Sequence, residues 1–267
     1  MSGANKWRVI LLIIMISILW VGIRELMEAK KIEVIFCDVG QGDGIIVKER
    51  NWELVVDVGP KNGEMVRCLG KYLPFWDKKL EVVILTHEDS DHVGGLGQVQ
   101  KHYQVERLMG GGKTSEQFNY TDNLSASDVI RLGKIEFEVV WPEGKAPAVA
   151  GFSGDKNSNS IVGKLRVGEK IFLLTGDAEA EVEEKLVWRG VLRQDFGTLH
   201  YLKVSHHGSK NGTTKTLLEA IKPEVAIISV GKNWFGHPSE EVLKRLREAG
   251  AEIWRTDERG DIKIEVD

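Results

Sequence analysis

Cysteine is scarce in this chain of 267 residues, which has two, and neither belongs to a Cys-x-x-Cys pair. Two cysteines cannot supply a disulfide-rich scaffold, and the missing pair excludes a zinc finger of that type. Cys37 lies in an apolar, strand-like run, which predicts a buried free thiol. A bridge between Cys37 and Cys68 is the alternative that the sequence leaves open.

The chain also lacks an excess of charge of either sign. Its 36 Lys and Arg nearly balance its 40 Asp and Glu, for a net charge of −4. Residues 1–31 are net basic, so residues 32–267 are more acidic than the whole. This composition excludes a general polyanion-binding protein. A nucleic-acid substrate would require a local basic patch or bridging metal ions.

The sequence has a single long apolar run, at its N-terminal end. Fifteen uncharged residues, Val9–Ile23, lie between Arg8 and Arg24. We expect residues 1–31 to form an uncleaved signal-anchor that crosses the membrane as a hydrophobic helix, with residues 32–267 outside the cytoplasm. A cleaved signal peptide, which would make the protein secreted, and a buried core helix are the alternatives.

The rest of the chain, residues 32–267, has the pattern of one mixed domain without repeats. Apolar runs predict strands at 32–37, 44–47, 53–58, 80–85, 135–140, 160–166, 170–174, 199–204, 225–230, 252–255 and 261–266. Amphipathic patterns predict helices at 64–73, 94–102, 180–189, 214–221 and 239–249. The polar, glycine-rich stretch 109–127 predicts a long loop. Short strands with helices among them are typical of an α+β fold with two packed sheets.

Four potential metal ligands lie within six residues, directly after the apolar strand Val82–Leu85. They are His87, Asp89, Asp91 and His92. An extended chain points alternate residues the same way, and repulsion between neighbouring carboxylates favours a bound cation. The segment therefore predicts a metal site.

Other strand-like runs end in an acid or a histidine. Asp57, Asp177 and the pair His206–His207 each follow such a run. Because the carboxyl ends of parallel strands meet at one edge of a sheet, we expect these side chains to converge on the first segment.

Taken together, these residues resemble the metallo-β-lactamase superfamily. His87-x-Asp89-x-Asp91-His92 is similar to its H-x-H-x-D-H motif, with Asp89 in place of a histidine. Within the superfamily, the chain most resembles the metallo-β-lactamase-like domain of the ComEC competence proteins. The shared motifs are DVGQGD at 38–43, N-x-N-S at 157–160, LLTGD at 173–177, K-V-x-H-H-G-S at 203–209, GHP at 236–238 and RTD at 255–257. The resemblance covers about residues 32–266 and, without the competence channel, implies a stand-alone relative.

The resemblance implies an αββα sandwich and two divalent metal ions. It implies six ligands: His87, Asp89, Asp91, His92, Asp177 and one histidine of the His206–His207 pair, for which we favour His207. The first two would hold one ion, the next two with His207 the other, and Asp177 would bridge both. One imidazole is replaced by the carboxylate of Asp89, and a further one is replaced by an amide of Asn157 or Asn159. These harder ligands favour Mn²⁺ over Zn²⁺, although either metal fits.

Further residues have expected roles around the metal ions. We expect four to support the site behind the ligands: Asp57, Asp38, Asp43 and Asn157. Three are expected to contact substrate: Gln41, Asn159 and Lys210. Three are expected to be catalytic: Asp91, His206 and His237. The simpler alternatives are that Asp38 and Asp43 only order their turn, that His237 is a turn residue, and that Lys203 and Lys210 are solvated charges.

The expected function is that of a membrane-anchored, extracytoplasmic, metal-dependent phosphodiesterase. The resemblance implies a nuclease acting on DNA, with single-stranded DNA as substrate and a connection to DNA uptake. Trp234 and Phe235 would stack a base or fill gaps in the core. The alternatives are an esterase of cell-wall phosphodiesters of the phosphorylcholine type, a hydrolase of amides or thioesters, and a non-catalytic binding module of the same fold. No protein partner is inferred.

Overall fold

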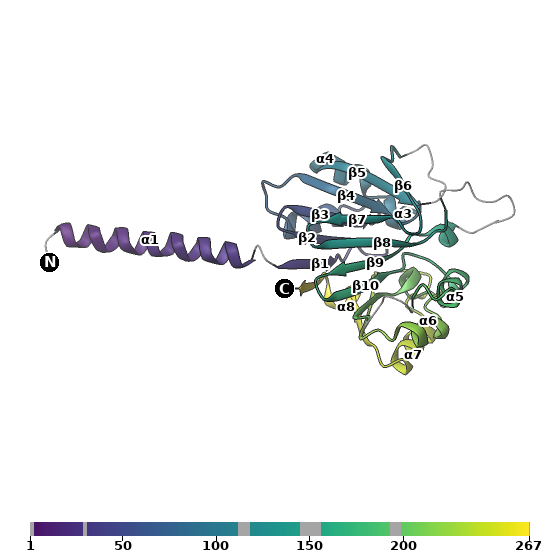
Figure 1. Cartoon of the computed structure of the whole chain (residues 1–267). Coiled ribbons are helices and arrows are strands. Elements are labelled where there is room, and N and C mark those ends of the chain that lie inside the picture. The colour runs from purple at the N-terminus through teal and green to yellow at the C-terminus, as the bar shows by residue number, and fades with distance from the viewer. Residues whose placement is uncertain (1–2, 29–30, 112–117, 145–155, 193–198, 267) are drawn as a thin grey trace.

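The computed structural model describes residues 3–28, 31–111, 118–144, 156–192 and 199–266, and it contains two seven-stranded sheets (Figure 1). In spatial order, the first sheet holds β14 (Ile262–Val266), β1 (Ile32–Phe36), β2 (Gly44–Glu49), β3 (Trp52–Val58), β4 (Lys79–Leu85), β5 (Gln104–Gly111) and β6 (Asp122–Leu124). The second holds β13 (Glu252–Arg255), β12 (Val225–Ile228), β11 (Tyr201–Lys203), β10 (Lys170–Leu174), β9 (Val162–Val167), β8 (Ile135–Trp141) and β7 (Val129–Leu132).

Helices cover the outer face of each sheet. They are α2 (Glu64–Tyr72), α3 (Ser90–Val93), α4 (Leu96–His102), α5 (Ala180–Trp188), α6 (Lys215–Ile221), α7 (Glu240–Glu248) and α8 (Thr256–Arg259), with 3₁₀ turns η1 (Lys156–Asn159) and η2 (Ser205–Gly208). Buried apolar side chains form three clusters, one between the sheets and one under each helical layer. In β1, Val34 and Phe36 face the other sheet while Ile35 faces α2, as the alternation of a strand requires. The predicted αββα sandwich is confirmed.

Parallel pairing brings the functional strand ends to one edge of the sandwich. In the first sheet β3 lies parallel to β4, with Val56 opposite Ile84. In the second, β10 lies parallel to β11, with Leu174 opposite Lys203. The chain leaves all four strands at the same edge, so the residues just beyond them are neighbours in space.

The N-terminal segment is a helix, α1 (Gly3–Glu28), which extends away from the sandwich (Figure 1). Within the part of the chain that the structure describes, however, no helix combines the length and the apolar character needed to cross a membrane. The predicted membrane anchor is therefore wrong, and the extracytoplasmic location that depended on it falls with it. The physical reason is the length of the uncharged part of the helix, Val9–Ile23. Its fifteen residues rise about 22 Å, which is less than the thickness of a hydrocarbon core, about 30 Å.

The two cysteines form a disulfide between Cys37 and Cys68, whose Cα atoms are 6.1 Å apart. The predicted free thiol at Cys37 is therefore wrong. Cys37 follows β1, and Cys68 lies on the face of α2 that packs against this sheet. The contact depends on how α2 packs, which the local sequence around Cys37 does not reveal.

Candidate metal centre

Asp57 organises the histidines that follow β4. It has a left-handed backbone conformation, with φ of 59°. Its carboxylate accepts hydrogen bonds from the backbone N–H of Thr86 at 2.8 Å and from the Thr86 hydroxyl at 2.7 Å. It also accepts one from Nδ1 of His92 at 2.8 Å. A single buried carboxylate thus fixes the start of the loop and the ring of a histidine six residues later.

The same network reaches His87. Its Nδ1 lies 3.1 Å from the Thr86 hydroxyl oxygen, which already donates its proton to Asp57. The hydroxyl oxygen must therefore accept from His87, so His87 and His92 both carry their proton on Nδ1. Each ring then turns Nε2 toward the interior of the site, which is the arrangement of metal-binding histidines.

Asp177 lies at the centre of the site, at the end of β10. Its backbone N–H donates to Ser160 Oγ at 3.0 Å. The preceding Gly176 has φ of 51°, and a Cβ there would lie 2.2 Å from the same Oγ, so the tight turn requires glycine. Four histidines surround the Asp177 carboxylate. Their Nε2 atoms lie 3.3 Å (His92), 3.5 Å (His207), 3.7 Å (His206) and 3.9 Å (His87) from its oxygens.

The His206–His207 pair stands on a strained turn, η2, with φ values of 46° and 53°. His207 is buried, and its Nδ1 donates to the carbonyl of Ser229 at 2.9 Å. His206 is one quarter exposed, and its Nδ1 lies 3.2 Å from Glu179 Oε1. Both rings are therefore oriented from behind, and both turn Nε2 toward Asp177.

Glu183 of α5 and Arg245 of α7 hold this turn in place. The buried Glu183 carboxylate accepts from the Ser205 hydroxyl at 2.7 Å and from the backbone N–H groups of Thr213 and Thr214 at 2.7 and 2.8 Å. The Arg245 guanidinium donates to backbone carbonyls of the same loop, including that of Lys210 at 2.9 Å. These bonds offset the cost of the positive φ values.

The residues fit divalent cations. Buried polar atoms without a hydrogen-bond partner converge on the centre: Nε2 of His87, His92 and His207, and Oδ1 of Asp177. Such atoms are costly unless a ligand satisfies them. His87, His92 and Asp177 form one group with ligand spacing, and Asp91, His92 and His207 form another. Asp91 Oδ2 lies 3.3 Å from His207 Nε2.

The pKa shifts agree with this chemistry. Burial, followed by repulsion from His92, lowers the pKa of His87 to about 4, so its imidazole is neutral. Burial lowers the pKa of His92, but the carboxylates of Asp177 and Asp57 outweigh it and hold that pKa well above its usual value. Burial raises the pKa of Asp91, but its contact with His207 and the charge of His92 bring it down to about 2. The Asp91 carboxylate is therefore ionised, and the carboxylates of the site favour positive charge on their neighbours, as a cation site requires.

A lysine lies inside the site. Lys203 is 1% exposed, and its ammonium contacts Asp43 and donates to the Gly176 carbonyl at 2.9 Å. It also lies 3.6 Å from Asp177 Oδ1. Lys203 is thus not the solvated charge that we considered, and Asp43 belongs to the buried network as well as to its turn.

The remaining predicted residues lie at different distances from the centre. Asp89 is 3.7 Å from His87 Nε2 but stands outside the ligand groups of the described residues. Asn157 is buried, with its amide 3.4 Å from His206 Nδ1, whereas Asn159 is exposed. Asp38 Oδ1 accepts from the Gly40 N–H at 3.3 Å, which orders the turn. Gln41 Oε1 accepts from the Gly231 N–H at 3.5 Å.

The loop after β12 forms a wall of the site. Asn233 shapes this loop: its amide donates to the carbonyls of Gly231 and His237 at 2.9 and 2.8 Å. The loop places the His237 ring 5.5 Å from that of His206. Trp234 and Phe235, at its tip, are 95% and 75% exposed, so they do not fill gaps in the core. Lys210 is exposed on the neighbouring turn.

Several supporting residues escaped the sequence analysis. Glu179, Glu183 and Asn233 contact the site or its loops, yet each resembles an ordinary polar surface residue in the sequence. The usable signal was the position of Glu183, on the apolar face of its helix beside Val182 and Leu186. An acidic residue at such a position requires buried partners.

Comparisons with known proteins agree with this geometry. A family profile described as the metallo-beta-lactamase superfamily matches residues 38–232. ComE operon protein 3 of Bacillus subtilis is 30% identical in an alignment 264 positions long, gaps included, that covers 86% of this chain and 32% of that protein. Competence protein ComA of Neisseria gonorrhoeae is 28% identical in an alignment of 268 positions that covers 98% of this chain and 36% of that protein. The chain spans about a third of the length of these two relatives.

One solved structure supports the fold alone. The metallo-beta-lactamase fold protein YhfI from Bacillus subtilis superposes with a TM-score of 0.60 at 12% identity. The superposition covers 88% of this chain and 100% of that one.

Proposed function

The chain belongs to the metallo-beta-lactamase superfamily, and from this premise we propose that it is a metal-dependent phosphodiesterase that cleaves single-stranded DNA. The comparisons confirm the family resemblance, including that to competence proteins. Members of this fold are generally metal-dependent hydrolases, so divalent ions are implied. The bond cleaved, the substrate and the metal are our proposal.

One observation carries the proposal: four imidazole Nε2 atoms surround the carboxylate of Asp177 within 3.9 Å. Asp91, His92 and His207 would hold one ion, His87 and Asp89 the other, and Asp177 would contact both. When bound, two divalent ions lower the pKa of a water held between them and polarise a phosphoryl oxygen. The carboxylates among the ligands favour Mn²⁺, and Zn²⁺ also fits the histidines.

The proton transfers fall to His206 and His237. The His206 side chain is one quarter exposed and so is open to solvent, and Glu179 Oε1, 3.2 Å from its Nδ1, orients the ring. Burial, followed by the neighbouring imidazoles of His206 and His207, lowers the pKa of His237. His237 is therefore neutral near pH 7 and can accept a proton, while His206 delivers one to the leaving oxygen.

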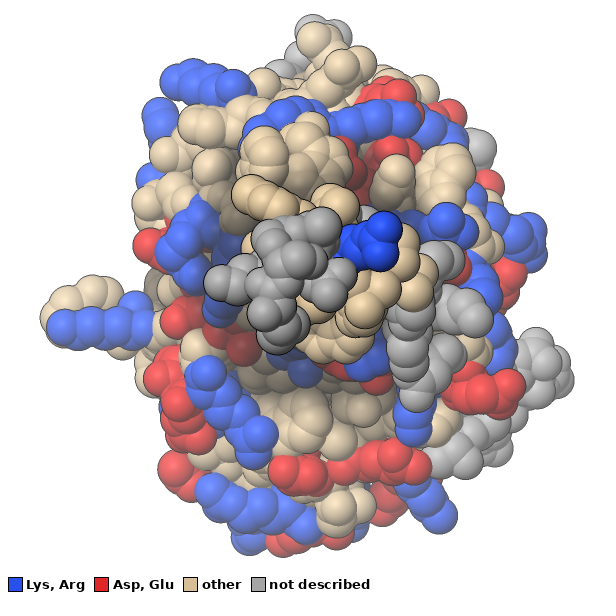
Figure 2. All heavy atoms as spheres, turned by 90° about the vertical axis from the view of Figure 1, so that its left-hand side faces the viewer, with Lys and Arg blue, Asp and Glu red and all other residues tan. Residues whose placement is uncertain are grey.

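Exposed aromatic residues beside the centre favour an unpaired nucleic acid. Trp234 and Phe235 stand at the tip of the loop that carries His237, free to stack on bases. On the face seen from the end where α1 leaves, the visible Lys and Arg are interspersed with Asp and Glu (Figure 2). Binding is therefore expected at the metal centre itself.

The test is hydrolysis of single-stranded DNA by the full chain with added Mn²⁺. Cleavage by the wild type, and none by Asp177→Asn, supports the proposal. Parallel assays with a phosphorylcholine ester, an amide and a thioester decide between the alternative hydrolases. Metal binding without turnover of any of these substrates would favour a binding module and overturn the proposal.

A further inference from the structure

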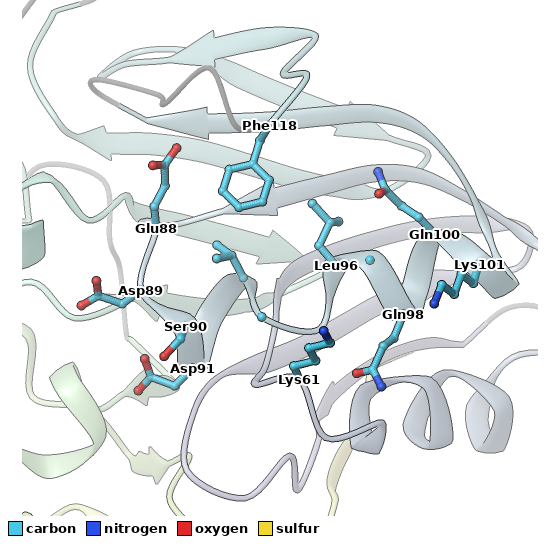
Figure 3. Close-up of a pocket in the computed structure, with 13 residues that line it drawn as sticks. Lys61, Glu88, Asp89, Ser90, Asp91, Leu96, Gln98, Gln100, Lys101 and Phe118 are labelled. Carbon is cyan, nitrogen blue, oxygen red and sulfur yellow. The ribbon is translucent and has the colours of Figure 1, made fainter.

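A hollow of about 870 Å³ opens directly beside the metal centre, over α3 and α4. Asp89 and Asp91 line the end of the hollow nearest the metal centre. Gln98 and Gln100 of α4 line the part beyond them. Lys61, from the loop between β3 and α2, and Lys101, from the last turn of α4, lie farther along. Figure 3 shows both lysines reaching toward the hollow from these two elements.

The charges of the hollow are arranged for an extended anion. Neither Lys61 nor Lys101 makes an ion pair with any residue that the structure describes, and both side chains are exposed. At the other end, Asp89 and Asp91 would be neutralised by cations. The third carboxylate of the lining, Glu88, is engaged by the Tyr120 hydroxyl, which donates to it at 3.2 Å. With the centre loaded, positive charge would therefore stand at both ends of the hollow, a spacing that suits successive phosphates of a chain.

We propose that this hollow binds the strand of single-stranded nucleic acid that lies on one side of the scissile phosphodiester, with Lys61 and Lys101 contacting its phosphates. The proposal rests on the proposed function, because the strand is placed by the bond that the centre cleaves. In this proposal, the exposed surface of α4 and the β3–α2 loop help to hold the substrate.

Phe118 decides between nucleic acid and other phosphodiester polymers. It lines the hollow across from Lys61 (Figure 3), and its ring is partly buried against the apolar cluster beneath this helical layer. Its ring is held from behind by Tyr120, at a centroid distance of 5.8 Å. An aromatic ring on one wall can stack on a base, and ammonium groups on the other wall can contact its phosphate. Sites for single-stranded nucleic acids usually combine these two contacts. A polyol phosphate has no planar group to use the ring.

Fluorescence anisotropy of a labelled single-stranded oligonucleotide of about twelve nucleotides tests the proposal. The Mn²⁺-loaded full chain is used, and the oligonucleotide carries phosphorothioate linkages, which keep the negative charge of each phosphate but resist cleavage. Replacing both lysines, Lys61→Gln with Lys101→Gln, is expected to weaken binding roughly tenfold at low salt. The slope of log affinity against log salt should fall by about 0.7 for each lysine lost. Phe118→Leu, which keeps an apolar side chain, is expected to weaken binding without changing that slope.

The control is Lys134→Gln. Lys134 is exposed, and its backbone N–H binds Glu49 at the end of β2 remote from the centre. This variant should bind as the wild type does. Unchanged affinity and salt slope in the double lysine variant would overturn the proposal, as would absence of binding by the wild type. Equal competition by a polyol phosphate polymer, with no effect of Phe118→Leu, would overturn the assignment to nucleic acid.

Hydrolysis of bis(p-nitrophenyl) phosphate by the Mn²⁺-loaded chain separates this proposal from the proposed function. This small diester has a single phosphate and no adjoining strand, so its hydrolysis reports on the metal centre of the wild type. Loss of its hydrolysis in the wild type would count against the hydrolytic function, whereas the binding results alone decide the role of the hollow.

Discussion

The Nδ1 atom of His92 lies 2.8 Å from a carboxylate oxygen of Asp57, so the ring is locked with Nε2 facing the centre. Asp57→Asn removes the charge that favours this orientation. We expect affinity for Mn²⁺ to fall by about 10- to 100-fold, as for other supporting carboxylates. Isothermal titration calorimetry of the full chain measures it. Asp122→Asn, in an exposed pair with Arg107, is the matched control, and equal affinities in the two variants would contradict the role of Asp57.

Lys203→Met should destabilise the metal-free protein. Burial lowers the pKa of Lys203, but Asp43 and Asp177 outweigh it, so the side chain is charged. Its removal leaves buried carboxylates without their counter-charge, which costs about 3 to 5 kcal/mol of unfolding free energy. Urea denaturation in EDTA measures the loss, with Lys134→Met as a surface control. Added Mn²⁺ should restore more stability to Lys203→Met than to the wild type, and no such difference would count against a shared electrostatic role.

Glu183→Gln tests the support of the His206–His207 turn. The amide offers one acceptor oxygen where the carboxylate offers two, so at least one buried N–H of the loop loses its partner. We expect a loss of about 1 to 3 kcal/mol and faster hydrogen exchange in residues 205–214. Glu184→Gln, one position along the same helix and exposed, should leave exchange unchanged. Protection of the loop equal to that of the wild type would show that Glu183 is dispensable.

Asp261 should make stability depend on acid pH. Burial raises its pKa, but hydrogen bonds from Arg67 and Lys71 and from the Asp38 N–H outweigh it and lower it to about 2. The ionised form is favoured by the fold, so its contribution is full above about pH 4 and is lost as the pH falls toward 2. The shift corresponds to about 2 kcal/mol. Unfolding of the wild type and Asp261→Asn across this range should show a shallower pH slope in the variant, and parallel curves would refute the linkage.

The sequence predicted the elements around the centre because their signals are local. The apolar run 80–85 and the polar segment His87–His92 can be recognised from neighbouring residues alone. The structure has β4 and then α3 at these positions. By contrast, β5 (Gln104–Gly111) overlaps the stretch expected to be a loop, because its exposed polar positions and glycines form a strand only through pairing with β4.

What the sequence could not show depends on contacts between distant segments. Lys203 ends the three-residue strand β11, next to buried Leu202. It can be buried because its ammonium pairs with the carboxylate of Asp43, which lies 160 positions earlier in the chain. Cys37 and Cys68 meet only after α2 packs on the sheet. The N-terminal run failed for another reason: its apolar character was evident, but its length did not suffice for a membrane span.

The most direct test of the central claim is the metal content of the purified full chain after loading with Mn²⁺ and removal of free metal. We expect two ions per chain by elemental analysis, and a large loss in Asp177→Asn, because the four histidines converge on that carboxylate. Absence of tightly bound metal in the wild type, or equal content in the variant, would contradict a two-metal centre built around Asp177.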